Sequence, residues 1–386
     1  MSKIDINKEI LIWAINRSGL NLNIIKKKFP KIDKWLNYED KPTIKQAEQL
    51  AKMLYIPFGM FFTRALPKDE ITIPFFRTKG EQKKLSPELI DTIHIIKQRQ
   101  DWVKEYFLKT GNEPLDFIGT VSVKDDINDV AVKIKNRLGF KENWAADFGT
   151  WQQAFNHFKD SVEKIGIFVI INGIVGNNTR RKLDVQEFRG FVMTDKLAPF
   201  VFINGQDARA AQIFTLAHEL VHVWLGKSAI FDLRELLPAD DKAEQFCDRV
   251  AAEFLVPQNA IRNIWETYKD DEDKYQKLAK HFKVSELVIA RRALDIKLIN
   301  KEQFLNFYKY YLNKERIKYK GGDFYLVQLQ RVGKKFGQIV HLAVKEGVLL
   351  YREAYKLTGL YGEIYEKFTK KLFEGKTEWI EKKLIF

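Results

Sequence analysis

The sequence predicts an α+β protein: short helices come first, a small sheet follows, and two helices and a mostly helical C-terminal region complete the chain. Three observations support this class. The 386 residues are 45% hydrophobic and 13% aromatic, enough for two or three packed domains. Residues 1–60 contain short helical runs broken by glycine and proline. Residues 166–204 contain short β-rich runs bounded by Gly, Asp, Pro and Asn, after which helical periodicity returns.

Charge and cysteine content narrow the class of protein. Lys and Arg number 65 against 51 Asp and Glu, a formal net charge of +14. This balance favours polyanionic partners such as nucleic acid, although solvated lysines spread over the surface would give the same count. The single cysteine, Cys247, excludes an internal disulfide framework and fits a reducing compartment. Because no signal-like segment and no run of 18 apolar residues occurs, we expect a cytoplasmic protein with no membrane contact.

Both ends of the chain are predicted to be helical. Residues 1–66 are expected to form an all-α domain of helix-turn-helix type, from KEILIWAINRSG, NLNIIKKKF, DKWLNYED and TIKQAEQLAKML. Its expected core residues are Ile12, Ile15, Leu22, Ile25, Trp35, Ala47, Leu50 and Leu54. Residues 67–120 should hold a proline-punctuated linker and one long helix between Ser86 and Gly111. Residues 300–386 are predicted to be a C-terminal helical domain of unknown role, with a turn at 321–325.

Residues 121–299 are expected to carry the sheet and two helices. The predicted strands lie in GIFVIING, FRGFVMTD and APFVFING. Asp207 to Leu225 predicts a helix because no Gly or Pro interrupts it and Gly226 follows as a C-cap. A second helix should start at an Asp cap at 240–241 and run to residue 255, where Pro257 stops it.

The stretch FTLAHELVHVWLG places His218 and His222 on one face of a helix. Two imidazoles four residues apart can bind one metal ion, and Glu219 is then available as a base rather than a ligand. A catalytic zinc requires a third protein ligand. Glu244 on the next helix is the first choice, and Asp248 one turn later could accept the other ring N–H of a ligating histidine. Zincins with a glutamate ligand have this layout.

Each of these residues also has an ordinary structural explanation. The histidines could be core residues, and the carboxylates could belong to a solvated helix or to an acidic helix start favoured by the macrodipole. The conjunction of all of them on two helices directly after a small sheet favours the metal site. Glu253 and Glu235 remain weaker candidates for the third ligand, and Cys247 is expected to be a buried small residue.

The consecutive motifs EFRGFVMTD, APFVFINGQD, FTLAHELVHVWLG and EQFCDRVAAEFLVP resemble those of the ImmA/IrrE family of metallopeptidases. The resemblance implies a zincin-like core with one Zn²⁺ per chain, His218, His222 and Glu244 as ligands, and Glu219 as general base. It also implies a protein substrate: a transcriptional repressor of the helix-turn-helix type, or an antitoxin-like protein. Cleavage of that substrate would derepress a mobile-element or stress response.

The N-terminal motifs WAINRSGLNL, WLNYEDKPTIKQAEQLAKML and IPFGMFF resemble the Xre-type helix-turn-helix that precedes this peptidase in longer members. Here the recognition-helix region is shortened to KKKFPKIDKWLNYED, with few side chains that could read base edges. Five lysines in it could contact DNA phosphates or a protein partner: Lys26, Lys27, Lys28, Lys31 and Lys34.

The preferred hypothesis is a zinc endopeptidase in which Glu219 takes a proton from the attacking water and passes it to the leaving amine. The substrate would pair along a sheet edge, at FRGFVM or APFVFI. The alternative is a DNA-binding transcription regulator whose metal site is structural or sensory, with DNA affinity that depends strongly on salt. In a third hypothesis the N-terminal domain recruits a repressor as substrate. Charge reversal of Lys26, Lys27 and Lys28 would abolish DNA binding in the second case and spare proteolysis of a tethered substrate in the third.

Overall fold

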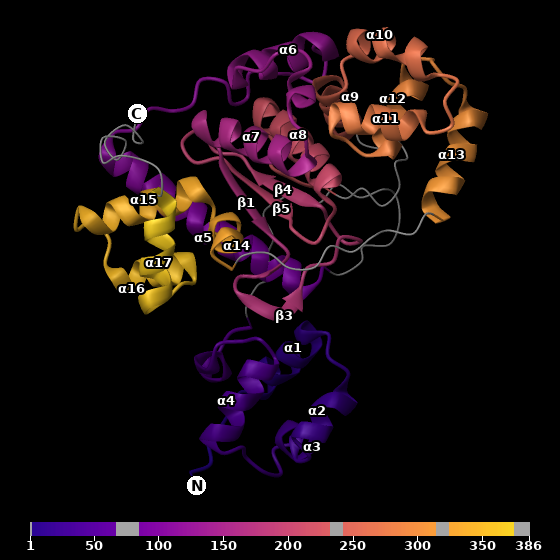
Figure 1. Cartoon of the computed structure of the whole chain (residues 1–386). Helices are drawn as coiled ribbons and strands as arrows, with labels where there is room; N and C mark the ends of the chain where they lie inside the picture. Colours follow the sequence, from indigo (N-terminus) through magenta and orange to yellow (C-terminus); the bar gives the residue numbers. More distant parts are fainter. Residues whose placement is uncertain (1, 67–84, 232–241, 314–323, 374–386) are drawn as a thin grey trace. The chain divides into compact units, whose positions relative to one another are not determined.

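The computed structural model describes residues 2–66, 85–231, 242–313 and 324–373 (Figure 1). The predicted linker after residue 66, the start of the predicted turn at 321–325, and Glu235 lie outside these ranges. Within them, no helix has the length and apolar character needed to cross a membrane. Contacts divide the chain into two compact units: residues 1–72 with 82–93, and residues 73–81 with 94–386.

The first unit is helical, as the sequence predicts. Its elements are α1 (Lys8–Ser18), α2 (Leu22–Lys28), α3 (Ile32–Leu36), α4 (Ile44–Met53) and the 3₁₀ helix η1 (Phe58–Phe62). Side chains cap three of the starts: Asn7 caps α1, Asn21 caps α2, and Thr43 forms a capping box with Gln46 at α4. The expected shortened segment corresponds to α3, which has only five residues.

Most of the predicted core of this unit is confirmed. The buried residues that were expected are Ile25, Trp35, Ala47, Leu50 and Leu54. The predictions for Ile12 and Leu22 are wrong, because these side chains are 41% and 36% exposed. Ile15 is partly buried and packs against the core. The buried stripe of α1 instead includes Ile10 and Ala14, which are one turn apart, so Ile12 between them points away from the core.

The second unit contains the sheet and the remaining helices. The elements up to the sheet are α5 (Pro87–Thr110), α6 (Ile127–Leu138), η2 (Trp144–Asp147) and α7 (Trp151–Lys164). Helix α5 belongs to this unit from His94 onward. The strands and the helix among them are β1 (Phe168–Asn172), β2 (Ile174–Val175), β3 (Asn178–Lys182), β4 (Gly190–Met193), β5 (Phe200–Asn204), α8 (Arg209–Leu225) and β6 (Ala229–Phe231). Helices α9 (Lys242–Leu255), α10 (Gln258–Tyr268), α11 (Lys274–Phe282), α12 (Glu286–Asp295), α13 (Lys301–Asn313), α14 (Phe324–Val332), α15 (Lys334–Lys345), α16 (Tyr351–Thr358) and α17 (Gly362–Phe373) follow.

The main sheet has the strand order β1-β5-β4-β6. Strand β1 is parallel to β5, while β4 is antiparallel to both β5 and β6. The three predicted strands are therefore confirmed, but the prediction that FRGFVM or APFVFI lies at an edge is wrong. Both are interior strands, because β5 lies between β1 and β4, and β4 lies between β5 and β6. Within the described residues, the edges of this sheet are β1 and β6.

Both faces of the sheet are covered, which explains why β1, β4 and β5 are buried along their whole lengths. Val169 and Ile171 of β1 belong to the core that includes α7 and α8. Phe168, on the other face, stacks on Phe200 with ring centroids 4.6 Å apart and lies near Phe107 of α5. In Figure 1, α7 and α8 lie over one face of the sheet and α5 and α14 over the other.

Helix α8 packs between the sheet and α9. It ends as predicted at Gly226, whose φ of 67° is the left-handed conformation that glycine adopts without strain. Helix α9 ends at Leu255, ahead of Pro257, as expected. The predicted Asp cap of α9 lies outside the described residues.

The helices after residue 300 pack in two places. Helix α13 packs on α12, whereas α14 and α15 pack on β1, and α15 also contacts α16 and α17. The backbone of α14 is held by Arg99 of α5, which donates hydrogen bonds to the carbonyl oxygens of Arg331 and Val332 at 3.2 and 3.4 Å.

Candidate metal centre

Three predicted ligands converge at the contact between α8 and α9. His218 and His222 are fully buried on α8, and Glu244 is 5% exposed on α9. The two Nε2 atoms lie 3.1 Å from each other. Each also lies 3.1 Å from a different carboxylate oxygen of Glu244. The i, i+4 spacing on α8 places both imidazoles toward α9, and the packing of the two helices places the carboxylate between them.

The spacing and chemistry of these atoms fit a divalent ion. Donors about 2.0–2.1 Å from a tetrahedral zinc lie about 3.3–3.4 Å from each other. The separations of 3.1 Å are close to this value. Imidazole and carboxylate ligands suit zinc and also accept other divalent metals.

Asp248 lies one turn after Glu244 and faces the other side of His218. Nδ1 of His218 donates to Oδ1 of Asp248 at 2.9 Å. This contact fixes the ring orientation and leaves Nε2 directed toward Glu244 and His222. Burial lowers the pKa of His218, but the hydrogen bonds to Asp248 and Glu244 outweigh burial and raise it to about 10. The site therefore favours a positive charge at this position, whether a proton or a metal ion supplies it.

Glu219 occupies a different place from the ligands. It is fully buried, and neither carboxylate oxygen has a hydrogen-bond partner among the described residues. Burial raises its pKa well above the ordinary value, with a smaller opposing effect from His218. An unsatisfied buried carboxylate costs free energy unless a ligand, water or substrate completes it. This environment suits a group that exchanges protons during a reaction.

Gly190 at the start of β4 makes room for Glu219, a role that sequence reasoning missed. A Cβ atom at this position would lie 2.6 Å from Cγ2 of Thr215, 2.8 Å from the carbonyl oxygen of Phe202 and 3.2 Å from Oε1 of Glu219. The signal in the sequence is the glycine inside an otherwise apolar strand motif, FRGFVM, which marks a close approach of another element.

We expect Gly190→Ala to destabilise the second unit by about 1–3 kcal/mol, because Thr215 and the Phe202 carbonyl cannot both move aside. The substitution should also displace the Glu219 side chain. Denaturant unfolding measures the first effect. Gly149→Ala is the matched control, since its Cβ would meet only Oε1 of Gln153 at an ordinary 3.4 Å. Equal unfolding midpoints for the two variants would contradict this account.

Cys247 is closer to the histidines than the sequence indicated. Its sulfur lies within 4.8 Å of ligand atoms of His218 and His222, so the three could together hold a metal ion. It is fully buried, as expected. Burial raises the pKa of the thiol well above its usual value, and nearby carboxylates, Glu244 first, raise it further. A thiol that resists ionisation is a poorer ligand than the carboxylate 3.1 Å from both imidazoles.

The structure gives Glu253 another partner. Glu253 forms an ion pair with Arg292 of α12 and accepts a hydrogen bond from the backbone N–H of Gln258 at 3.1 Å. A carboxylate with two such partners at the far end of α9 is a structural group. The remaining rival, Glu235, lies outside the described residues.

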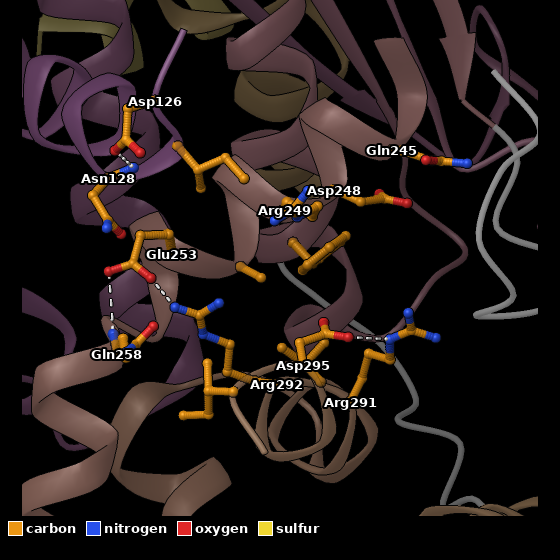
Figure 2. Close-up of a pocket in the computed structure, with 15 residues that line it drawn as sticks. Asp126, Asn128, Gln245, Asp248, Arg249, Glu253, Gln258, Arg291, Arg292 and Asp295 are labelled. Atoms are coloured by element: carbon orange, nitrogen blue, oxygen red, sulfur yellow. Dashed lines mark hydrogen bonds and ion pairs between the residues drawn. The ribbon is translucent and has the colours of Figure 1, made fainter. Parts of the chain in front are cut away.

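A cavity of about 520 Å³ lies between α6, α9 and α12, and Asp248 forms part of its wall (Figure 2). Its other charged groups are largely paired with one another. Figure 2 shows the Glu253–Arg292 pair and the contact of Arg291 with Asp295, which is 3.0 Å long. Asp126 caps α6. Asp248 thus both lines this cavity and accepts the hydrogen bond from His218.

The five lysines singled out in the first unit lie on α2, on α3 and in the turn between them. Lys26 forms an ion pair with Asp33 at 2.9 Å, and Lys31 forms one with Asp40 at 3.1 Å. The other three, Lys27, Lys28 and Lys34, are exposed.

Two regions of the chain match family models. Residues 332–371 match a domain of unknown function, DUF8813. No curated protein and no solved structure matched the chain. Residues 162–294, which include the sheet, both histidines and all the carboxylates of the site, match the M78 peptidase family, described as the IrrE N-terminal-like domain. The paired histidines and the buried Glu219 carboxylate thus belong to a region that matches a family of peptidases.

Proposed function

We propose that the protein is a zinc-dependent endopeptidase with His218, His222 and Glu244 as ligands and Glu219 as general base. The observation that carries the proposal is the buried Glu219 carboxylate, which has no hydrogen-bond partner within the described ranges and lies beside the converging imidazoles. A structural zinc site is normally closed by four protein ligands and has no use for such a carboxylate. The peptidase match of residues 162–294 supports the same class of reaction.

Each side chain has a separate task in this reaction. A bound zinc would polarise the scissile carbonyl and acidify the attacking water. Glu219 accepts the proton of that water and delivers it to the leaving amine, which its raised pKa favours. Asp248 holds His218 in the tautomer that leaves Nε2 free to bind the metal.

The sheet edge next to the site suggests where a substrate would bind. In the described residues, β6 pairs on one side only, with β4 in the register Gly190 to Phe231, Phe191 to Ile230 and Val192 to Ala229. It follows α8 directly, and α8 carries the histidines. An extended peptide could add to the free side of β6 through backbone hydrogen bonds. We therefore propose β6 as the strand that pairs with the substrate, instead of the interior strands β4 and β5.

Metal content and peptide cleavage test the proposal together. We expect elemental analysis of the purified full chain to find about one zinc per chain. Incubation with a proteome-derived peptide library should produce new termini, detected by mass spectrometry. A chelator should abolish them, and added zinc should restore them. Absence of stoichiometric metal after zinc loading would refute the metal site, and metal binding without cleavage would leave a structural or sensory site.

For the substrate we propose a transcriptional repressor or antitoxin-like protein, cleaved in a mobile-element or stress response. The helical first unit would recruit it. The basis is the resemblance of its motifs to Xre-type domains together with its short α3, which leaves little surface for reading bases. The exposed lysines on α2 and α3 favour a second candidate, a DNA-binding regulator. A DNA-binding regulator, however, would not need a general base such as Glu219.

A further inference from the structure

A second cavity, of about 600 Å³, lies at the carboxyl ends of the parallel strands β1 and β5. Elements far apart in the sequence form it: α7, the turns after β1 and β5, the start of α8, and the α14–α15 segment. Its wall includes Gly173 and Gly205 after the strands and Arg209 at the start of α8. The carboxyl ends of neighbouring parallel strands are a common place for ligands in α/β proteins. A cavity of this volume accepts a ligand of nucleotide size.

The cavity wall is rich in cations. Four basic side chains line it, Lys159, Arg209, Arg331 and Lys334, against one acidic side chain, Asp160. Lys159 is neutralised by Asp160 at 2.6 Å and by Glu163 at 3.1 Å. The other three form no ion pair with any residue in the described part of the chain.

Arg209, Arg331 and Lys334 are partly withdrawn from solvent. Burial lowers the pKa of Arg209 and of Arg331, which is the expected effect on a guanidinium that lacks a carboxylate partner. Several apolar side chains complete the wall: Ile171, Ile174, Val327 and Leu329. The wall therefore offers both cationic donors and an apolar surface.

Specific contacts hold the α14–α15 side of the cavity in place. Gly333 has a φ of 88°, and a Cβ there would lie 2.4 Å from Cδ1 of Ile170, so only glycine lets the chain pass against β1. Glu163 of α7 accepts a hydrogen bond from the backbone N–H of Lys335 at 3.3 Å, in addition to its ion pair with Lys159. These contacts hold the backbone between Arg331 and Lys334, the two residues that flank this turn.

We propose that this cavity binds a small phosphorylated molecule that carries two or more negative charges and an apolar portion. Arg209, Arg331 and Lys334 would bind the phosphate oxygens through charge-assisted hydrogen bonds. A ligand there would join the C-terminal helices to the first residue of α8, the helix that bears His218 and His222. The helices after residue 323 would then contribute to ligand binding, a role that does not depend on peptidase activity.

Calorimetric titration of the full chain at physiological salt tests this proposal, with ADP, inorganic pyrophosphate and adenosine as probes. We expect one ADP per chain and no binding of adenosine. The double variant R331Q/K334Q should lose about 10- to 100-fold in affinity for ADP. The matched control is K356Q/K370Q, because it also removes two positive charges, those of the exposed Lys356 of α16 and Lys370 of α17, both outside the cavity; it should bind as the wild type does. Thermal unfolding checks that both variants are folded; if R331Q/K334Q is not, Lys334→Gln replaces it and Lys356→Gln becomes its control.

The outcomes separate the possible ligands. Binding of pyrophosphate as tightly as ADP would identify the phosphate groups as the whole determinant, and tighter ADP binding would show that the apolar wall contributes. Failure of both phosphate compounds to bind would overturn the proposal. Equal affinity in R331Q/K334Q and in K356Q/K370Q would overturn it too, because the net charge of +14 would then explain the binding. A single-stranded oligonucleotide that binds only when Arg331 and Lys334 are intact would replace the small molecule by a nucleic acid.

Discussion

Glu219→Gln is expected to lower the rate of peptide hydrolysis by about 10²- to 10⁴-fold, the usual contribution of a positioned general base. The amide has nearly the same size and stays within the same buried space, but it cannot accept a proton from water. Because Glu219 is proposed as a base and not as a ligand, metal content should not change. Cleavage of library peptides by wild type and variant at equal zinc occupancy measures the effect.

The stability of Glu219→Gln provides an internal control. The wild-type carboxylate is buried without a hydrogen-bond partner in the described part of the chain, so its replacement by a neutral amide should leave the unfolding midpoint unchanged or raise it. A functional group that is costly to the fold is typical of active sites. A variant with full activity would exclude Glu219 as the base. A variant that loses metal would instead make Glu219 a ligand.

Loss of a residue that only hydrogen-bonds to a metal ligand lowers metal affinity by roughly 10- to 100-fold. Glu244→Ala should lower zinc affinity by more than this, because it removes a direct ligand. It also leaves the two buried imidazoles without their shared carboxylate. Competition with a fluorescent zinc chelator measures the affinity. Peptide cleavage should fall in proportion to the zinc that is lost.

Cys247→Ser decides between Glu244 and Cys247 as the third ligand. The thiol lies near both imidazoles, but its raised pKa disfavours the thiolate that would bind zinc. We therefore expect Cys247→Ser to retain wild-type zinc affinity. Loss of zinc in Cys247→Ser, with retention in Glu244→Ala, would reverse the assignment and make Cys247 the ligand.

The candidate site was largely visible in the sequence because helical periodicity is a local property. The spacing of His218 and His222, and of Glu244 and Asp248, places each pair on one helix face whatever the surrounding fold. Gly190 was not predicted as part of the site, because the approach of β4 to Thr215 and Glu219 depends on how α8 lies across the sheet. The distance between Cys247 and the histidines depends in the same way on the rotation of α9.

The sequence by itself determined the helical first unit, the three apolar strands, the helices at 209–225 and 242–255, and the residue types of the candidate metal centre. Hydrophobic periodicity, capping residues and glycine or proline breaks act over a few residues, so they can be read without a structure. Only the tertiary structure decided the strand order, which makes FRGFVM and APFVFI interior strands and β6 an edge. It also brought Arg331 and Lys334 to the ends of β1 and β5. Strand pairing and cavities of this kind arise from contacts between distant segments, which local patterns do not encode.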